Sequence, residues 1–155
     1  MTPAINSARH AGIAFQLHEY HHDASAPSYG LEAAEKLGVT AEQVFKTLVV
    51  SLDGKQLAVG IVPVSCQLGL KHIAKAAGAK KAAMAPPEIV ERTTGYVLGG
   101  VSPLGQKKRL PTFIDASAQG WSTLYISAGR RGLEIELSPS DLATLSQGHF
   151  AELSA

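Results

Sequence analysis

The segment Val44–Val64, VFKTLVVSLDGKQLAVGIVPV, carries the strongest local pattern in the chain. Two runs rich in β-branched residues flank the dipeptide Asp53-Gly54, which favours a type I′ turn. We therefore predict a β-hairpin. In its first strand, alternation places Thr47 on one face of the sheet and Lys46 on the other.

Shorter elements are expected on both sides of this hairpin. Apolar spacing and capping residues predict helices over residues 1–12, 29–38, 70–78, 86–95 and 138–146. Apolar alternation and β-branched runs predict strands over residues 13–22, 111–117, 121–127 and 132–138. Helices and strands interleave without a regular βαβ rhythm, so we expect the α+β class with a curved, mixed or antiparallel, barrel-like sheet flanked by helices.

The composition is that of an ordinary globular protein. The 155 residues are 45% hydrophobic and 17% charged, with a formal net charge of +1 and a single cysteine. We expect one domain spanning residues 1–155, soluble and cytoplasmic, without a signal peptide or a membrane-spanning segment. One cysteine excludes an internal disulfide and a CxxC metal site. Any nucleic-acid-binding patch must be local, because the chain as a whole is nearly neutral.

The segment Thr94–Pro111, TGYVLGGVSPLGQKKRLP, joins a glycine-rich turn to three adjacent cations. Gly99 and Gly100 allow a ligand to approach the backbone closely, and Pro103 stiffens the loop. Successive N–H groups could then bind an oxyanion or a phosphate. The segment ends in charges suited to a polyanion backbone, on Lys107, Lys108 and Arg109. The alternative is a surface turn followed by a solvated charged segment.

Lys46 is a second candidate, because it lies at the start of a strongly apolar strand. If both faces of the strand are covered, its ammonium group lies at a pocket wall and needs an anionic partner. The alternative is that the side chain reaches water from the end of the strand.

The segment HEYHHD, residues 18–23, could suggest a metal site, with His18, Tyr20 and His22 on one strand face. The other histidines show no spacing that completes a ligand set, so we expect a polar strand end, where Tyr20 could also line a pocket. Cys66 lacks a local nucleophile signature and is expected to be a small buried apolar group.

Two further sets of side chains carry no motif of their own. The hydroxyls of Thr47, Ser102 and Ser127 belong to no identifiable Ser-His-Asp arrangement. Glu134 and Glu136 share a strand face, and we expect them to form ion pairs with Arg130 or Arg131.

Three segments together resemble the YbaK/EbsC-type aminoacyl-tRNA editing proteins, which are relatives of the editing domain inserted in bacterial prolyl-tRNA synthetase. These segments are VFKTLVV (44–50), TTGYVLGGVSPLGQKKRLPT (93–112) and YISAGRRGLEIEL (125–137). The likeness extends over nearly the whole chain and implies the fold of that family.

The resemblance also implies roles for individual residues. The family's key lysine matches Lys46, and its GxxxP loop matches Gly99–Pro103. The remaining matches line the substrate pocket: Tyr20, Tyr29, Thr47, Ser102, Pro103, Ser127, Gly129 and Glu134. Two of them depart from the expected pattern, because Tyr29 stands where phenylalanine is usual and Glu134 where aspartate is expected.

The activity that the resemblance implies is that of an aminoacyl-tRNA deacylase, a hydrolase- or lyase-type enzyme of translation fidelity. It would remove cysteine mischarged on proline tRNA, with cysteine tRNA as a further substrate. The cysteine thiol would attack its own ester, Lys46 would orient the nucleotide, and the amides of Gly99 and Gly100 would stabilise the oxyanion. No metal or cofactor is expected, and prolyl-tRNA synthetase is an expected transient partner. The alternatives are an alanine-specific deacylase of the same scaffold and a non-catalytic module that binds tRNA or the synthetase.

Overall fold

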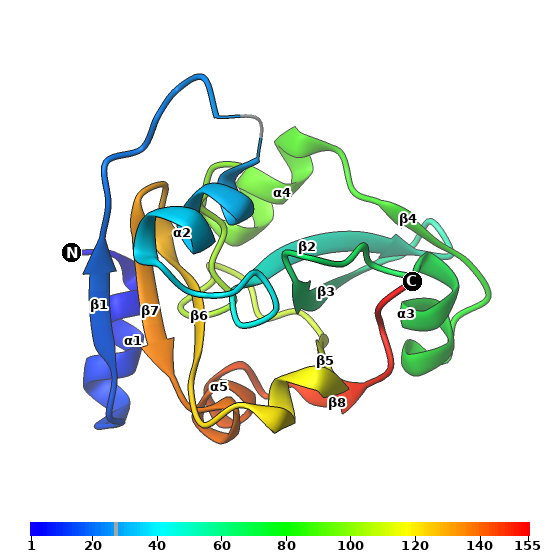
Figure 1. Cartoon of the computed structure of the whole chain (residues 1–155). Coiled ribbons are helices and arrows are strands. Elements are labelled where there is room, and N and C mark those ends of the chain that lie inside the picture. The colour runs from blue at the N-terminus through cyan, green and yellow to red at the C-terminus, as the bar shows by residue number, and fades with distance from the viewer. Residues whose placement is uncertain (27) are drawn as a thin grey trace.

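The predicted hairpin forms the centre of the larger of two β-sheets in the computed structural model, which describes residues 1–26 and 28–155 (Figure 1). Strands β2 (Phe45–Leu52) and β3 (Gln56–Pro63) are antiparallel. Asp53 and Gly54 have φ angles of 53° and 67°, as a type I′ turn requires. The ladder pairs Leu52 with Gln56, so the connection has one residue more than the expected two-residue turn.

The larger sheet is mixed and has the strand order β4-β2-β3-β5-β8. β4 (Ala82–Met84) pairs antiparallel with β2, whereas β5 (Thr112–Asp115) and β8 (His149–Ala151) extend the other side in parallel. β4 and β8 were not predicted, because three residues are too few to show an alternating pattern.

The smaller sheet is antiparallel, with the order β1-β7-β6. It contains β1 (Gln16–Glu19), β6 (Leu124–Arg130) and β7 (Leu133–Leu137). The expected single curved sheet is therefore two ladders, joined by a parallel bridge between Val44 and Tyr125. The strand predicted over residues 13–22 is shorter than expected, because only its four central residues pair with β7.

The five α-helices lie close to their predicted positions: α1 (Pro3–Ala11), α2 (Tyr29–Leu37), α3 (Leu70–Ala77), α4 (Pro87–Thr94) and α5 (Pro139–Ser146). The hydroxyls of Thr2, Ser28 and Ser138 accept N–H groups at the starts of α1, α2 and α5. A short 3-10 helix, η1 (Ala116–Gly120), was not predicted. None of the helices in the described part of the chain is long and apolar enough to cross a membrane.

Two apolar clusters cover the opposite faces of β2 and β3. Phe45 and Val49 pack with residues of α1, α5, β6 and β7, and the partly buried Trp121 lies against this larger cluster. Val50 and Leu52 pack on the other face with Ile73 of α3. This division follows the predicted alternation along β2, and the α+β class is confirmed.

Candidate functional site

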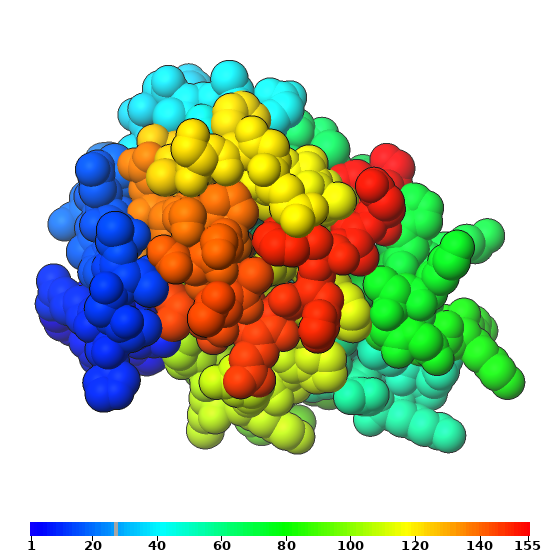
Figure 2. Space-filling view, turned by 90° about the horizontal axis from the view of Figure 1, so that it is seen from below, coloured from blue at the N-terminus to red at the C-terminus, as the bar shows by residue number. Residues whose placement is uncertain are grey.

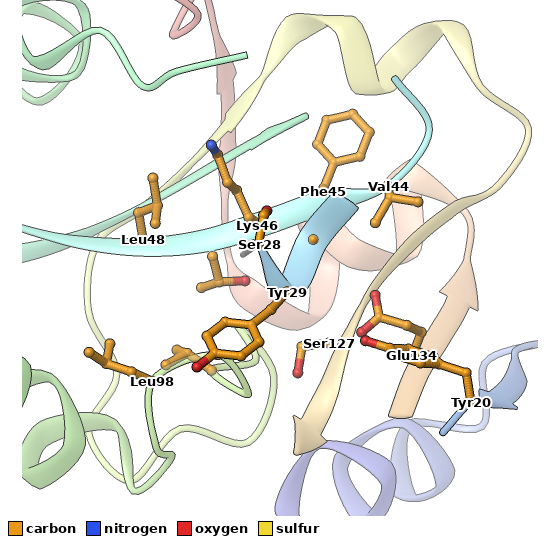
Figure 3. Close-up of a pocket in the computed structure, with 14 residues that line it drawn as sticks. Tyr20, Ser28, Tyr29, Val44, Phe45, Lys46, Leu48, Leu98, Ser127 and Glu134 are labelled. Carbon is orange, nitrogen blue, oxygen red and sulfur yellow. The ribbon is translucent and has the colours of Figure 1, made fainter. Parts of the chain in front are cut away.

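A cavity of about 280 Å³ lies where the start of β2 meets the smaller sheet and α2 (Figure 3). Its wall combines main-chain turns, apolar side chains and a few polar groups. The lining residues are Tyr20, Ser28, Tyr29, Gly30, Val44, Phe45, Lys46, Thr47, Leu48, Leu98, Gly99, Val101, Ser127 and Glu134. The cavity therefore brings together six separate stretches of the sequence.

Seven of the predicted site residues line this cavity. They are Tyr20, Tyr29, Lys46, Thr47, Gly99, Ser127 and Glu134. The apolar wall residues were not predicted, because isolated valine, leucine and phenylalanine side chains look the same in a core and in a pocket.

Lys46 and Thr47 approach the cavity from different faces of β2. The Lys46 side chain points away from Ser127 and Glu134 in Figure 3, and desolvation by burial lowers the pKa of its ammonium group. The Thr47 hydroxyl is buried and has no hydrogen-bond partner within residues 1–26 and 28–155. A buried hydroxyl without a partner is costly, so Thr47 offers a polar contact that a ligand could satisfy.

Glu134 supplies the acidic wall of the cavity. The β6–β7 ladder sets it directly opposite Ser127, and only 6% of the residue is exposed. Desolvation by burial raises the pKa of the Glu134 carboxyl to about 8, so this group is mostly protonated at neutral pH. Tyr20 lies beside it in Figure 3, and burial together with the nearby Glu134 raises the pKa of the Tyr20 phenol to about 12.

The expected ion pairs of Glu134 and Glu136 with the neighbouring arginines are not formed. Glu136 instead contacts His18 Nε2 at 2.9 Å and accepts a hydrogen bond from the Thr123 hydroxyl at 2.6 Å. Arg130 lies 3.5 Å from the exposed Glu19 carboxylate. Alternation placed the two glutamates on one face correctly, but it could not show that Glu136 finds its partners in His18 of β1 and in Thr123.

The glycine turn forms the opposite wall. Gly99 has φ of +86°, and a Cβ atom there would lie 2.6 Å from both Tyr29 Cδ2 and Arg131 Nε. The position therefore requires glycine for its backbone angle and for space. The Gly100 amide differs from our expectation, because it already donates to the Val97 carbonyl at 3.0 Å and Gly100 does not line the cavity.

Arg131 holds the rim of the cavity together, although the sequence analysis gave it only an ion-pair role. Its Nε and Nη2 atoms donate to the Leu98 carbonyl at 3.0 and 2.7 Å. Its guanidinium carbon lies 4.3 Å from the centre of the Tyr29 ring, within cation–π range. The exposed Arg131 side chain thus links the glycine turn to α2, a contact that no local pattern in the sequence reveals.

The buried Glu32 carboxylate of α2 joins residues 22 and 23 to that helix. Glu32 accepts from His22 Nδ1 and the Asp23 N–H, both at 2.7 Å, and from Lys36 Nζ at 3.1 Å. Burial opposes ionisation, but these hydrogen bonds prevail and lower the pKa of Glu32 to about 2. These contacts of Glu32 were not predicted. They lie next to Tyr20 and Tyr29, which both line the cavity.

Several predicted site residues lie outside the cavity. Ser102 is fully buried and its hydroxyl accepts from the Leu104 N–H, so it shapes the loop. Gly129 sits in a bulge of β6, with φ of +112°, against Tyr96 and Thr2. The other four are Pro103, Lys107, Lys108 and Arg109, of which Pro103 and Arg109 line a separate cavity of about 100 Å³.

Two histidines of the histidine-rich segment contact carboxylates. His18 contacts Glu136 and His22 contacts Glu32. Within the described residues, no three histidine, cysteine, aspartate or glutamate side chains are grouped as a metal site would require. Cys66 is half-buried and follows β3. Its electrostatic effect raises the pKa of the Lys46 ammonium group and so opposes the larger effect of burial.

A named relative matches most of the chain. A protein of Enterococcus faecalis, EbsC, is 43% identical over 120 residues, which cover 77% of this chain and 73% of that protein. EbsC is provisionally named as a Cys-tRNA(Pro)/Cys-tRNA(Cys) deacylase.

Two solved structures share the fold. One, provisionally described as a trans-editing enzyme for prolyl-tRNA synthetase, has a TM-score of 0.85 and 24% identity and covers 100% of this chain and 99% of its own. The other, the hypothetical protein APE2540, has a TM-score of 0.86 and 23% identity, with 99% of each chain covered. The model of the aminoacyl-tRNA editing domain matches residues 25–145, and the chain belongs to this family.

Proposed function

We propose that this aminoacyl-tRNA editing protein is a deacylase that removes cysteine from proline tRNA, with cysteine tRNA as a further substrate. The likeness to EbsC supports the choice of amino acid. The observation that carries the proposal is a single cavity lined by Lys46, Thr47, Gly99 and Glu134. These residues supply a cation, a buried hydroxyl that has no partner among the described residues, a glycine turn that lets a ligand approach the backbone closely, and a buried acid.

The positions of these groups support one orientation of the substrate. The small aminoacyl group would enter the part of the cavity bounded by Thr47, Ser127 and Glu134. The terminal ribose and phosphate would lie toward Lys46, whose ammonium group points away from that part (Figure 3). A cavity of about 280 Å³ suits a small aminoacyl group, being near the lower end of the range for ligand pockets.

The proposed reaction uses the nucleophile of the substrate itself. The cysteine thiolate attacks the ester carbonyl, a carbon–sulfur bond forms, and the bond to the ribose oxygen breaks. The ribose oxygen takes a proton, and water then opens the resulting thiolactone to free cysteine. A thiol pKa near 8.5 provides some thiolate at neutral pH. The step needs no strong base from the protein, because the substrate thiol is partly ionised by itself. Glu134 keeps its proton at neutral pH, since burial raises the pKa of its carboxyl to about 8.

The Gly99 N–H is the donor proposed for the oxyanion that forms during the attack. Gly99 lines the cavity, and its N–H makes no backbone hydrogen bond within the described residues. The Gly100 amide is engaged with Val97, so Gly99 takes the role that we first expected both glycines to share. Removing one such donor in other enzymes costs roughly 2.7–4 kcal/mol of transition-state stabilisation.

The partners follow from this substrate. We propose that residues 1–155 act as one editing unit and that prolyl-tRNA synthetase is a transient partner. Lys107, Lys108 and Arg109 are exposed and remain candidates for contacts with the tRNA backbone. Such contacts should weaken as salt rises, because binding releases counterions from the RNA.

A deacylation panel tests the proposal. Proline tRNA charged with cysteine, alanine or serine is incubated with the protein, and release of the amino acid is followed over several turnovers. Cysteine should be released much faster than serine, because the serine hydroxyl is the poorer nucleophile. Lys46→Ala should abolish most of the release and serves as the negative control.

Other outcomes of the panel would replace the proposal. Equal rates for cysteine and serine would exclude attack by the substrate thiol. Faster release of alanine would indicate an alanine-specific deacylase, and binding without turnover would indicate a non-catalytic module.

A further inference from the structure

The end of the molecule farthest along β2 from the cavity carries a dense group of lysines. Residues 53–84 contain five of the nine lysines of the chain and only one acidic residue, Asp53. We call this group the lysine surface, and it consists of Lys55, Lys71, Lys75, Lys80 and Lys81. All five are exposed, and none forms an ion pair within residues 1–26 and 28–155.

Backbone contacts hold two of these lysines, Lys80 and Lys81, in place. The Asp53 carboxylate accepts the N–H groups of Lys80 and Lys81 at 3.1 and 2.8 Å. The Asp53 N–H in turn donates to the Lys81 carbonyl at 2.9 Å. The tip of the β2–β3 hairpin is thereby fixed to the start of β4, and the only acidic side chain among residues 53–84 is used in that contact. An open groove bounded by Lys55, Lys80 and Lys81 lies at this junction.

The remaining two lysines extend the surface onto α3. Lys71 and Lys75 are four residues apart, so they lie on the same side of the helix. Like charges at this spacing destabilise a helix unless a counter-charge is near. In Figure 2, the green part of the surface, which corresponds to α3 and β4, projects long side chains from one end of the molecule.

The lysine surface lies on the side of the sheet to which Lys46 points. Even-numbered residues of β2 face α3, as Val50 and Leu52 show by packing with Ile73. The distance along β2 from Lys46 to Leu52 is about 20 Å, from six residues at roughly 3.3 Å each. Val50 and Leu52 are buried under α3, so a ligand anchored near Lys46 would reach the lysine surface across the outside of that helix.

We propose that the lysine surface binds the double-stranded acceptor stem of the tRNA whose single-stranded 3′ end occupies the cavity, an inference that rests on the proposed function. A duplex backbone presents phosphates at regular spacing and needs cations without their own partners. Because only one end of the molecule carries this charge, RNA binding is compatible with a net charge of +1.

The basic segment formed by Lys107, Lys108 and Arg109 carries the same charge as three residues of the lysine surface, so it serves as a comparison. Arg109 shares its small cavity with residues of α1 and α5, Ser7 and Leu145. Those two helices pack on the face of the sheet opposite to α3. The two basic regions therefore lie on opposite sides of the larger sheet, and their contributions to RNA binding can be separated by substitution.

The experiment uses the variant Lys75→Gln/Lys80→Gln/Lys81→Gln. Two matched variants are Lys75→Arg/Lys80→Arg/Lys81→Arg, which keeps the charge, and Lys107→Gln/Lys108→Gln/Arg109→Gln, which removes the same charge elsewhere. Binding of uncharged proline tRNA is measured between 50 and 200 mM salt. Release of cysteine is measured from charged tRNA and from the cysteinyl ester of the trinucleotide CCA, which has no stem.

The glutamine variant at positions 75, 80 and 81 should bind tRNA at least roughly tenfold more weakly at 50 mM salt. Its slope of log Kd against log salt should be smaller by about 2.7, since three cations no longer displace counterions from the duplex. Release from the CCA ester should match that of the wild-type protein, and the arginine variant should bind tRNA normally.

Two results would overturn this assignment. One is unchanged tRNA binding by the variant with glutamine at positions 75, 80 and 81, and the other is an equal loss of its activity on charged tRNA and on the CCA ester. Failure of the proposed function would look different. The wild-type protein would then bind tRNA through the lysine surface without releasing cysteine.

Discussion

Two buried polar groups of the cavity are left without partners by the rest of the described chain. The Thr47 hydroxyl has no hydrogen bond, and the Glu134 carboxyl makes no ion pair within residues 1–26 and 28–155. Unpartnered polar groups lower the stability of a fold, so their presence in one cavity is informative. It suggests that a ligand completes them, and this can be tested one residue at a time.

Substitution of Thr47 separates a role in binding from a role in the fold. Thr47→Val keeps the branched shape but removes the unpartnered hydroxyl, so the free energy of unfolding should be unchanged or higher by about 1 kcal/mol. Loss of a hydrogen bond to the substrate should lower kcat/KM for cysteine release by about tenfold. Urea unfolding and deacylation kinetics check the two effects. A variant that is less stable but fully active would show that Thr47 only supports the core.

Glu134 should make the stability of the protein depend on pH. The pKa of its carboxyl is raised from its ordinary value of 4.5 to about 8, so the folded state keeps a proton that the unfolded chain releases between these values. The free energy of unfolding should therefore fall as pH rises from 5 to 8. The Glu134→Gln variant cannot ionise at this position. Its free energy of unfolding should therefore decrease by about 2–4 kcal/mol less than that of the wild-type protein over the same pH range.

Urea unfolding of both proteins at pH 5, 6, 7 and 8 measures this difference directly. All other ionisable groups are common to both proteins, so their contributions cancel in the comparison. Parallel pH profiles would mean that the Glu134 carboxyl ionises in the fold near its ordinary pKa.

At the scale of elements, the turn formed by residues 97–100 is the most tightly constrained part of the cavity wall. Its carbonyl at Leu98 is held by Arg131, and its Gly99 position faces Tyr29 with no space for a side chain. The turn is therefore rigid although it is a loop, which a group that positions an oxyanion requires.

Gly99→Ala should damage this turn more than a change of backbone angle alone explains. Gly12→Ala is a matched control, because Gly12 has φ of +71° and no atom within 4 Å of an added Cβ. Both changes should cost about 1 kcal/mol of stability from the positive φ. Gly99→Ala adds the contacts at 2.6 Å and should also lower cysteine release by more than tenfold.

Thermal unfolding and single-turnover release measure both properties for each variant. Equal activity of the two alanine variants would exclude a catalytic role for the turn. Retained activity in Gly12→Ala is expected, since α1 contributes no residue to the cavity.

The elements were predictable to different degrees from the sequence. The central hairpin and the five α-helices followed from alternation, glycine stops and capping residues such as Thr2 and Ser138. The strands β4 and β8 were missed, because their three-residue lengths depend on partners supplied by the folded sheet. The Arg131–Leu98 contact was missed for the same reason, since it joins residues 33 positions apart. Lys46 and Glu134 were found mainly through family resemblance, and no composition rule would have placed them together.

At the scale of the whole molecule, the cavity connects the two sheets. Thr47 belongs to the five-stranded sheet, whereas Ser127 and Glu134 belong to the three-stranded one. The direct backbone link between the sheets is the bridge of Val44 to Tyr125, beside the cavity. A ligand that contacts both walls would therefore add a second connection.

Such a ligand should stabilise both sheets together. An uncleavable analogue, adenosine with cysteine joined through a 3′-amide, should raise the free energy of unfolding by about 2.7 kcal/mol at 100 times its Kd. Hydrogen exchange should slow in β2 and in β6, because opening either sheet would break contacts to the ligand. Thermal unfolding and exchange monitored by mass spectrometry provide the measurements. Protection confined to one sheet would argue against a ligand that spans the cavity.

The position of Trp121 makes this protein convenient for optical measurements. It is the only tryptophan, it packs partly buried against the larger apolar cluster beside η1, and it does not line the cavity. Its emission should report exposure of that cluster to solvent, with no direct quenching by a nucleotide in the cavity. A spectral change on adding ligand to the native protein would therefore reveal a rearrangement transmitted across the fold.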